Sequence, residues 1–82
     1  MKSTTKEVEA KHKEQITLAL YQRDYELVNR YHPVLLEQIE AAITSGITPD
    51  QVKRWAMATV EEAEIVQRIH NAARWYAESL NR

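Results

Sequence analysis

Three histidines are the first residues in this chain whose chemistry could serve a site. Glu9 and His12 have the Glu-x-x-His spacing that places two metal ligands on one face of a helix. A di-iron bundle needs a second such pair and two further carboxylates, and the chain has no second Glu-x-x-His. We expect His32 to shape or cap a helix junction before Pro33, and His70 to be a partly buried structural residue. No metal and no cofactor are predicted.

The two Trp and four Tyr residues offer a different kind of chemistry, since Trp, Tyr and Arg dominate protein-binding sites. Trp75 is expected to lie off the apolar stripe of the last helix, near Arg68. Tyr21 and Tyr25 are one turn apart on the first helix and form a second candidate surface. A helical domain without Phe also needs large aromatic core residues, and we predict that Trp55 is one of them.

The segment Gln38–Met57 has a helix-turn-helix spacing. The motif requires a small residue at the helix crossing, a turn glycine and apolar residues that lock the second helix. These positions are filled, in order, by Ala42, Gly46, Ile47, Val52 and Trp55. The segment resembles the general motif, and the resemblance implies that Gln51, Lys53 and Arg54 would face DNA.

Charge and one motif position depart from this DNA-binding pattern. Ser45 stands where an apolar residue is usual, and Lys53 and Arg54 are the only cations nearby. Several carboxylates follow almost at once, whereas a DNA reader neutralises several phosphates with Lys and Arg. DNA binding is therefore kept as the alternative hypothesis.

Sequence motifs of enzymes are missing. The chain contains no glycine-rich phosphate loop, no His-Glu-x-x-His and no Gly-x-Ser-x-Gly. The adjacent Glu61 and Glu62 are better explained by the preference of helix N-termini for negative charge. We predict that the protein is not an enzyme.

The elements that position these residues are predicted to be helices, because one Gly, two Pro and no Phe are too few turn and strand residues for a sheet protein. The sequence predicts an all-α domain of four helices. Thr4 and Glu7 can cap the first helix, which runs to Tyr31. Pro33 must end or kink it, and a break with Pro33 at the start of the second helix is favoured.

The later boundaries follow from capping signals. Gly46 is expected to end the second helix in a left-handed conformation. Thr48 and Gln51 can form a capping box with Pro49 at the first helical position, so the third helix is predicted from Pro49 to about Met57. Thr59 with Glu62 repeats the signal and predicts a fourth helix from Val60 to about Leu80.

The predicted fourth helix is the most clearly amphipathic. One face is expected to carry its apolar residues, with Ala72 and Ala77 at the edges. That face comprises Ile65, Val66, Ile69, Ala73, Tyr76 and Leu80. A chain of 82 residues builds only a small core, and self-association is one way to bury more surface.

Composition narrows the function classes further. Hydrophobic residues make up 44% of the chain, which argues against disorder, and the absence of Cys excludes disulfides and thiolate sites. A net charge of −1 gives no general bias toward nucleic acid or acidic membranes. No stretch approaches a membrane span or a signal-peptide core, so we expect a cytoplasmic protein. Residues 1–82 are expected to form one domain, with residues 1–5 frayed.

These observations favour a small, non-enzymatic protein–protein interaction or assembly module. Its expected partner is a protein, most simply a second copy in a homo-oligomer, with Trp75, Arg68, Tyr21 and Tyr25 as candidate contacts. No membrane or small-molecule partner is predicted. The alternative is a helix-turn-helix DNA-binding protein.

Overall fold

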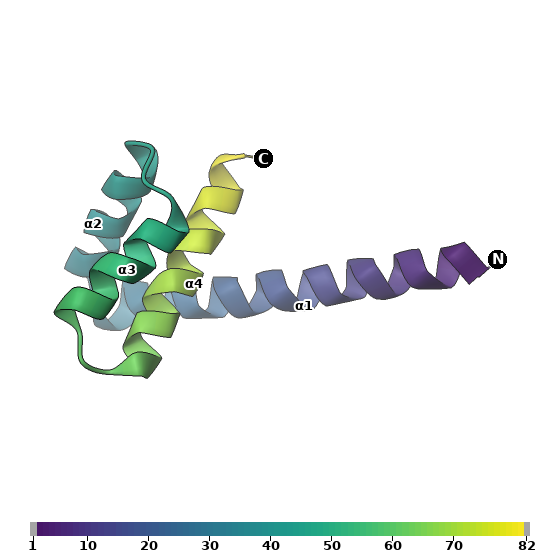
Figure 1. The fold of residues 1–82 in the computed structure, drawn as a ribbon, viewed down its shortest axis with the longest axis horizontal. Coiled ribbons are helices and arrows are strands. Elements are labelled where there is room, and N and C mark those ends of the chain that lie inside the picture. The colour runs from purple at the N-terminus through teal and green to yellow at the C-terminus, as the bar shows by residue number, and fades with distance from the viewer. Residues whose placement is uncertain (1, 82) are drawn as a thin grey trace.

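The computed structural model describes the backbone of residues 2–81 and the side chains of residues 11–81. It contains four helices: α1 (Lys2–Tyr31), α2 (Pro33–Thr44), α3 (Pro49–Thr59) and α4 (Ala63–Leu80). No strand occurs among residues 2–81. The predicted all-α fold is therefore confirmed (Figure 1).

The break between α1 and α2 lies where the sequence predicted it. α1 ends at Tyr31, and Pro33 is the first residue of α2, where its missing N–H costs nothing. His32 between them leaves the helical region, with φ −139° and ψ 59°, and its side chain makes no capping hydrogen bond. At its other end α1 begins at Lys2, so Thr4 lies inside the helix and is not the predicted N-cap.

The turn between α2 and α3 is closed by backbone hydrogen bonds around Gly46. Gly46 has φ +104°, the left-handed region that favours glycine. Its amide donates to the Ile43 carbonyl at 3.0 Å, and the Ile47 amide donates to the Ala42 carbonyl at 3.0 Å. These two bonds form a Schellman motif, so the predicted glycine cap is confirmed.

The N-terminus of α3 has the predicted capping box. The Gln51 amide donates to the Thr48 hydroxyl oxygen at 3.3 Å, and the Thr48 amide donates to Oε1 of Gln51 at 2.9 Å. Pro49 occupies the first helical turn. The direction of α3 after the turn is thus set by local hydrogen bonds as well as by packing.

The boundary between α3 and α4 differs from the prediction. α3 continues through Thr59, and α4 begins only at Ala63. The Thr59 hydroxyl donates back to the Trp55 carbonyl at 3.1 Å, so it belongs to the last turn of α3 and does not cap α4. Glu62 occupies the N-cap position of α4 without a side-chain capping bond. The predicted Thr59–Glu62 capping box is wrong because a threonine hydroxyl can bond a carbonyl four residues earlier equally well.

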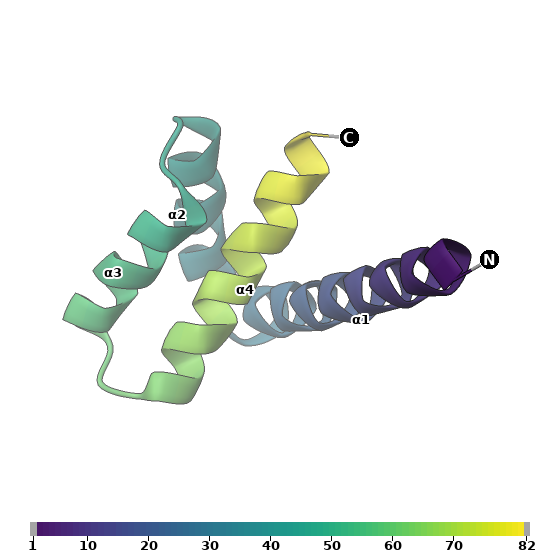
Figure 2. The same ribbon diagram turned by 45° about the vertical axis from the view of Figure 1, so that its right-hand side comes forward.

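The core is built around α4, which contacts each of the other three helices. Ile69, Ala72 and Ala73 are completely buried, together with Ala56 of α3. Ala72 was predicted at the edge of the apolar face, and Leu80 was predicted on it, but Leu80 is exposed. The buried face is rotated toward Ala72 because α1 and α3 approach α4 from different sides (Figure 2). The remaining core residues are Val28, Leu36, Ile39, Ile43, Val52 and Val66.

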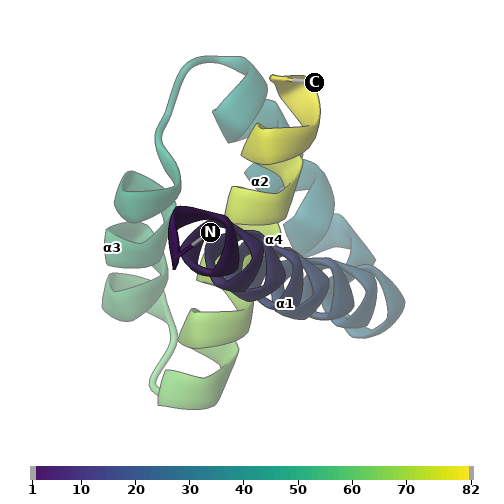
Figure 3. The same cartoon turned by 90° about the vertical axis from the view of Figure 1, so that its right-hand side faces the viewer.

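The first half of α1 extends beyond this core. Figure 1 shows the N-terminal part of α1 running away from α2, α3 and α4, which are grouped at its C-terminal end, and in Figure 3 the same part points toward the viewer. All side chains from Lys11 to Thr17 are exposed. The radius of gyration is 14.5 Å, whereas a compact domain of this length would have about 12 Å. We call residues 2–17 the α1 arm.

Hydropathy separates these helices from membrane-spanning ones. Among the described residues, none of the helices combines the length and apolar character that a membrane crossing requires.

Because other helices approach α4 closely at Ala72, a larger side chain at this position should destabilise the fold. Ala72→Leu adds three carbon atoms at a completely buried position, and we expect it to lower the free energy of unfolding by about 1–3 kcal/mol. The matched control is Ala58→Leu on the exposed side of α3, which should change it by less than about 0.5 kcal/mol. Urea unfolding followed by circular dichroism measures both, and equal midpoints would contradict the tight packing around α4.

Candidate functional site

The predicted contact residue Arg68 lies on the side of the molecule where α1 and α4 run next to each other. It is exposed and lines two adjoining hollows between these helices. Glu64, one turn earlier on α4, lines both as well. The hollow nearer the arm has a volume of about 250 Å³ and includes Leu20 and Arg23 of α1. The other, of about 140 Å³, includes Leu27 and Tyr31. Together the hollows form a shallow channel along α1.

Trp75 is not part of this channel. It is half-buried and lies two turns beyond Arg68 on α4, which corresponds to about 10 Å along the helix axis. Its backbone carbonyl accepts a hydrogen bond from the Ser79 hydroxyl at 2.9 Å. Trp75 and Arg68 therefore lie on one side of α4 without lining a common hollow.

The second predicted surface, Tyr21 with Tyr25, is turned toward the other helices. The Arg74 guanidinium of α4 lies over the Tyr21 ring, 5.5 Å from its centroid, in a cation–π contact. Tyr25 packs against the core and donates its hydroxyl to Oε1 of Glu40 on α2 at 3.0 Å. Burial raises the pKa of the Tyr25 hydroxyl, and the bond to Glu40 raises it further. Both side chains are half-buried and have contacts within the chain.

A buried carboxylate that was not predicted from the sequence lies beneath the channel. Asp24 is almost completely buried and accepts a hydrogen bond from the Asn71 side-chain amide at 2.7 Å. The Arg23 guanidinium lies 3.5 Å from its other oxygen. Asp24 is three residues after Tyr21 and four before Val28, which places it on the inward stripe of α1. That spacing was the available signal, although Asn71 could not be identified as the partner without the helix arrangement.

His70 is buried at the interface of α3 and α4, as the sequence analysis expected of a structural histidine. Its Nε2 is 3.1 Å from Oδ1 of Asp50 at the start of α3. Burial lowers the pKa of His70 below its ordinary value of 6.5, and the Arg74 and Lys53 charges lower it further. The bond to Asp50 opposes this shift, but the Asp50 side chain is largely exposed to solvent. His70 is thus a neutral imidazole at neutral pH, and its Nε2–H donates to Asp50.

The predicted DNA-contacting residues have different surroundings. Gln51 is exposed, but its side-chain oxygen is bonded to Thr48 in the capping box. Lys53 is half-buried and close enough to His70 to affect that pKa, whereas Arg54 is exposed. Exposed Glu37 on α2 and Asp50 on α3 offset Lys53 and Arg54, so these charges do not sum to a positive patch.

Trp55 corrects a further prediction. It was expected in the core, but 43% of its surface is exposed. The helix-turn-helix spacing places Trp55 next to α2, where it lines one wall of an apolar groove of about 350 Å³ and is not covered by α4. The other lining residues are Gln38, Ile39, Ala42, Ile47, Gln51 and Val52.

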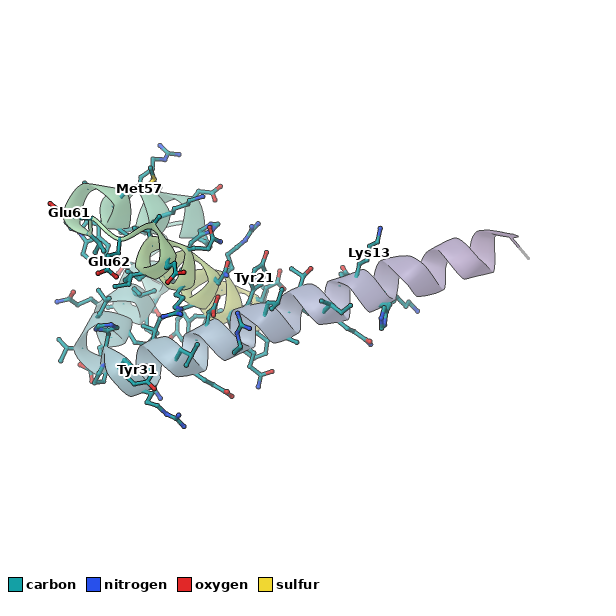
Figure 4. The ribbon with its side chains drawn as sticks, turned by 90° about the horizontal axis from the view of Figure 1, so that it is seen from below. Lys13, Tyr21, Tyr31, Met57, Glu61 and Glu62 are labelled. Carbon is teal, nitrogen blue, oxygen red and sulfur yellow. The ribbon has the colours of Figure 1, made fainter. Side chains whose placement is uncertain are left out.

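A further hollow with polar and charged side chains lies beside the α1 arm. Where the α1 arm meets the end of α4, a hollow of about 630 Å³ is lined by Lys13 and Arg74 and also by Glu14 and Glu78, so opposite charges offset each other. Figure 4 shows Lys13 on the arm, far from Met57, Glu61 and Glu62 at the opposite end of the molecule. Among the described side chains, no three potential metal ligands come together. His12 is exposed, and the Glu9 side chain lies outside the described residues.

Comparisons of the chain with protein-family models, with curated proteins and with solved structures give no match. The geometry described above is therefore the basis for the proposals that follow.

The state of His70 leads to a prediction about pH. An unfolded chain binds a proton at His70 near pH 6.5, whereas the folded chain resists protonation, so stability should fall as the pH drops below about 6.5. In His70→Gln, whose side-chain amide still offers a donor toward Asp50, this loss should be missing. Thermal unfolding between about pH 7.5 and pH 5 measures the difference.

His12→Gln is the matched control, because His12 is exposed. It should retain the pH dependence of the wild-type protein. If wild type and His70→Gln lost melting temperature in parallel over this range, His70 would not be a buried neutral group.

Proposed function

We propose that this protein is a non-enzymatic helical module that acts by binding another protein, and that its primary partner is a second copy of itself. The observation that carries the proposal is the α1 arm, a helical segment that extends out of the core. Its side chains from Lys11 to Thr17 are all exposed.

The surface area supports this proposal quantitatively. The chain exposes 6238 Å², whereas a compact monomer of 9.6 kDa would expose roughly 5,100 Å². The excess of about 1,100 Å² exceeds the roughly 800 Å² that each partner buries in a typical stable interface. An extended arm thus provides enough surface for a specific association.

The energetics of helices point in the same direction. Most helical stability in proteins comes from packing an apolar face, and a polar helical segment with few tertiary contacts gains little from its own propensity. The arm therefore benefits from any partner that covers it. A second copy would cover the arm without requiring another protein, and each copy would gain the same contact.

The proposed contact surface lies on the side of the molecule where α1 packs against α4. It includes Arg68, which was predicted from the sequence as a contact residue. Arg68 is exposed between the two hollows of the channel. Tyr21 and Tyr25 contribute less, because both already have contacts within the chain. The proposal includes no cofactor, and the cytoplasm remains the expected compartment.

Light scattering coupled to size exclusion tests self-association directly. We expect a mass near twice 9.6 kDa that falls toward the monomer on dilution. High salt should change it little, because the arm and channel carry charges of both signs. A monomeric mass at all concentrations up to about 1 mM would contradict self-association, since it would imply an affinity weaker than about 4 kcal/mol.

DNA binding is a second candidate, because the Schellman turn and the capping box hold α2 and α3 in a helix-turn-helix order with Arg54 exposed. Fluorescence anisotropy with random-sequence and genomic DNA fragments tests it. If it holds, affinity should fall steeply with salt, and Arg54→Ala should weaken binding and reduce the salt slope. Absence of binding even at low salt would remove this candidate.

A further inference from the structure

An apolar stripe follows one side of α1 from the arm to the end of the helix. Ile16 is 50% exposed, Leu20 is 44% exposed and Tyr31 is 65% exposed, with Leu27 half-buried between them. Spacings of four and seven residues return to nearly the same side of an α-helix. The stripe therefore spans about 22 Å of helix length. Its Leu20, Leu27 and Tyr31 side chains line the channel between α1 and α4.

The spacing of this stripe is symmetric. From Ile16 to Tyr31 the intervals are four, seven and four residues, so the order reads the same in both directions. A two-fold axis halfway between Leu20 and Leu27 would place Leu20 of one copy opposite Leu27 of the other. The same axis would place Ile16 opposite Tyr31. Such a self-complementary patch is what a closed two-fold dimer requires.

We propose that the stripe Ile16, Leu20, Leu27 and Tyr31 is the seam of an antiparallel homodimer, in which residues 16–31 of the two α1 helices lie against each other. This inference rests on the proposed self-association and adds the surface and the orientation. The antiparallel arrangement brings Ile16 and Leu20 of one copy against the Leu27 and Tyr31 end of the channel in the other, whereas a parallel pair would leave that end of the channel open.

The charges beside the seam fit a second copy better than a strongly charged partner. Arg23 and Arg68 line the hollow nearer the arm together with Asp24 and Glu64, two charges of each sign, and Glu62 lines the other hollow. Arg23 is also only 3.5 Å from the Asp24 carboxylate in its own chain, which offsets its charge near the two-fold axis. The chain as a whole has a net charge of −1, so two copies repel each other little.

Cysteine cross-linking tests the orientation, since the chain has no Cys of its own. Ile16→Cys and Tyr31→Cys are prepared separately and also unfolded and refolded as a mixture, then oxidised in a glutathione buffer. We expect the mixture to form a disulfide-linked dimer between the two variants, while each variant alone cross-links poorly. A disulfide forms only where the two Cα atoms come within about 7 Å. Efficient self-cross-linking of each variant alone would indicate a parallel seam and overturn the proposal.

Leu20→Glu tests the seam energetically. A carboxylate at this position would be buried opposite Leu27, so the dimer dissociation constant should rise at least about thirtyfold. Leu80→Glu is the matched control, because Leu80 is similarly exposed but lies outside the stripe, at the end of α4. Circular dichroism verifies that both variants fold, and light scattering gives their masses.

The outcomes separate this inference from the proposed function. If the wild-type protein is a dimer but neither cross-linking nor Leu20→Glu behaves as expected, the seam is wrong and self-association remains. A monomeric wild-type protein would overturn both. A dimer that cross-links only in the mixed sample and dissociates in Leu20→Glu supports both.

Discussion

The structure depends on the close packing of one short segment, Ile69–Ala73 in the middle of α4. Ile69, Ala72 and Ala73 are completely buried, and His70 between them is nearly so. Two alanines in succession remove side-chain bulk, so other helices can approach the α4 backbone closely while Ile69 fills the space at the centre. Because α4 contacts all three other helices, a change in this segment alters the interface of α4 with each of them.

Around this apolar centre, each pair of packed helices except α2 and α3 is joined by a side-chain hydrogen bond. The four bonds are Tyr25 with Glu40, Thr44 with Tyr76, Asp50 with His70, and Asp24 with Asn71. Two involve well-buried groups, which are costly unless they are paired. Alternative packings of the same helices would leave Asp24 or His70 without a partner. The polar contacts therefore select one arrangement from those that the small apolar core would allow, whereas α2 and α3 are related mainly by the turn at Gly46.

Features that depend on residues close together in the chain could be predicted from the sequence. Features that depend on contacts between distant residues could not. The break at Pro33, the glycine turn and the Thr48–Gln51 box involve residues within a few positions of each other, and all were predicted correctly. The Thr59 prediction failed because this hydroxyl can either accept from an amide of the next helix or donate to a carbonyl of the preceding turn, and sequence does not rank the two. Trp55 failed because its position relative to α4 depends on the crossing of three helices. The channel at Arg68 and the Asp24–Asn71 bond join residues that are far apart in the chain, so no spacing rule could pair them.

The continuity of α1 also has a mechanical consequence. A helix of 30 residues without an interruption is a rod about 45 Å long, and its C-terminal half is clamped in the core by Asp24, Tyr25 and Val28. A load applied to the arm is therefore transmitted to the core as a torque and is not absorbed by a hinge. The first break in the helical backbone is at His32, beyond the clamp. A rod held in this way fixes the distance and the direction from the core to each residue along its length.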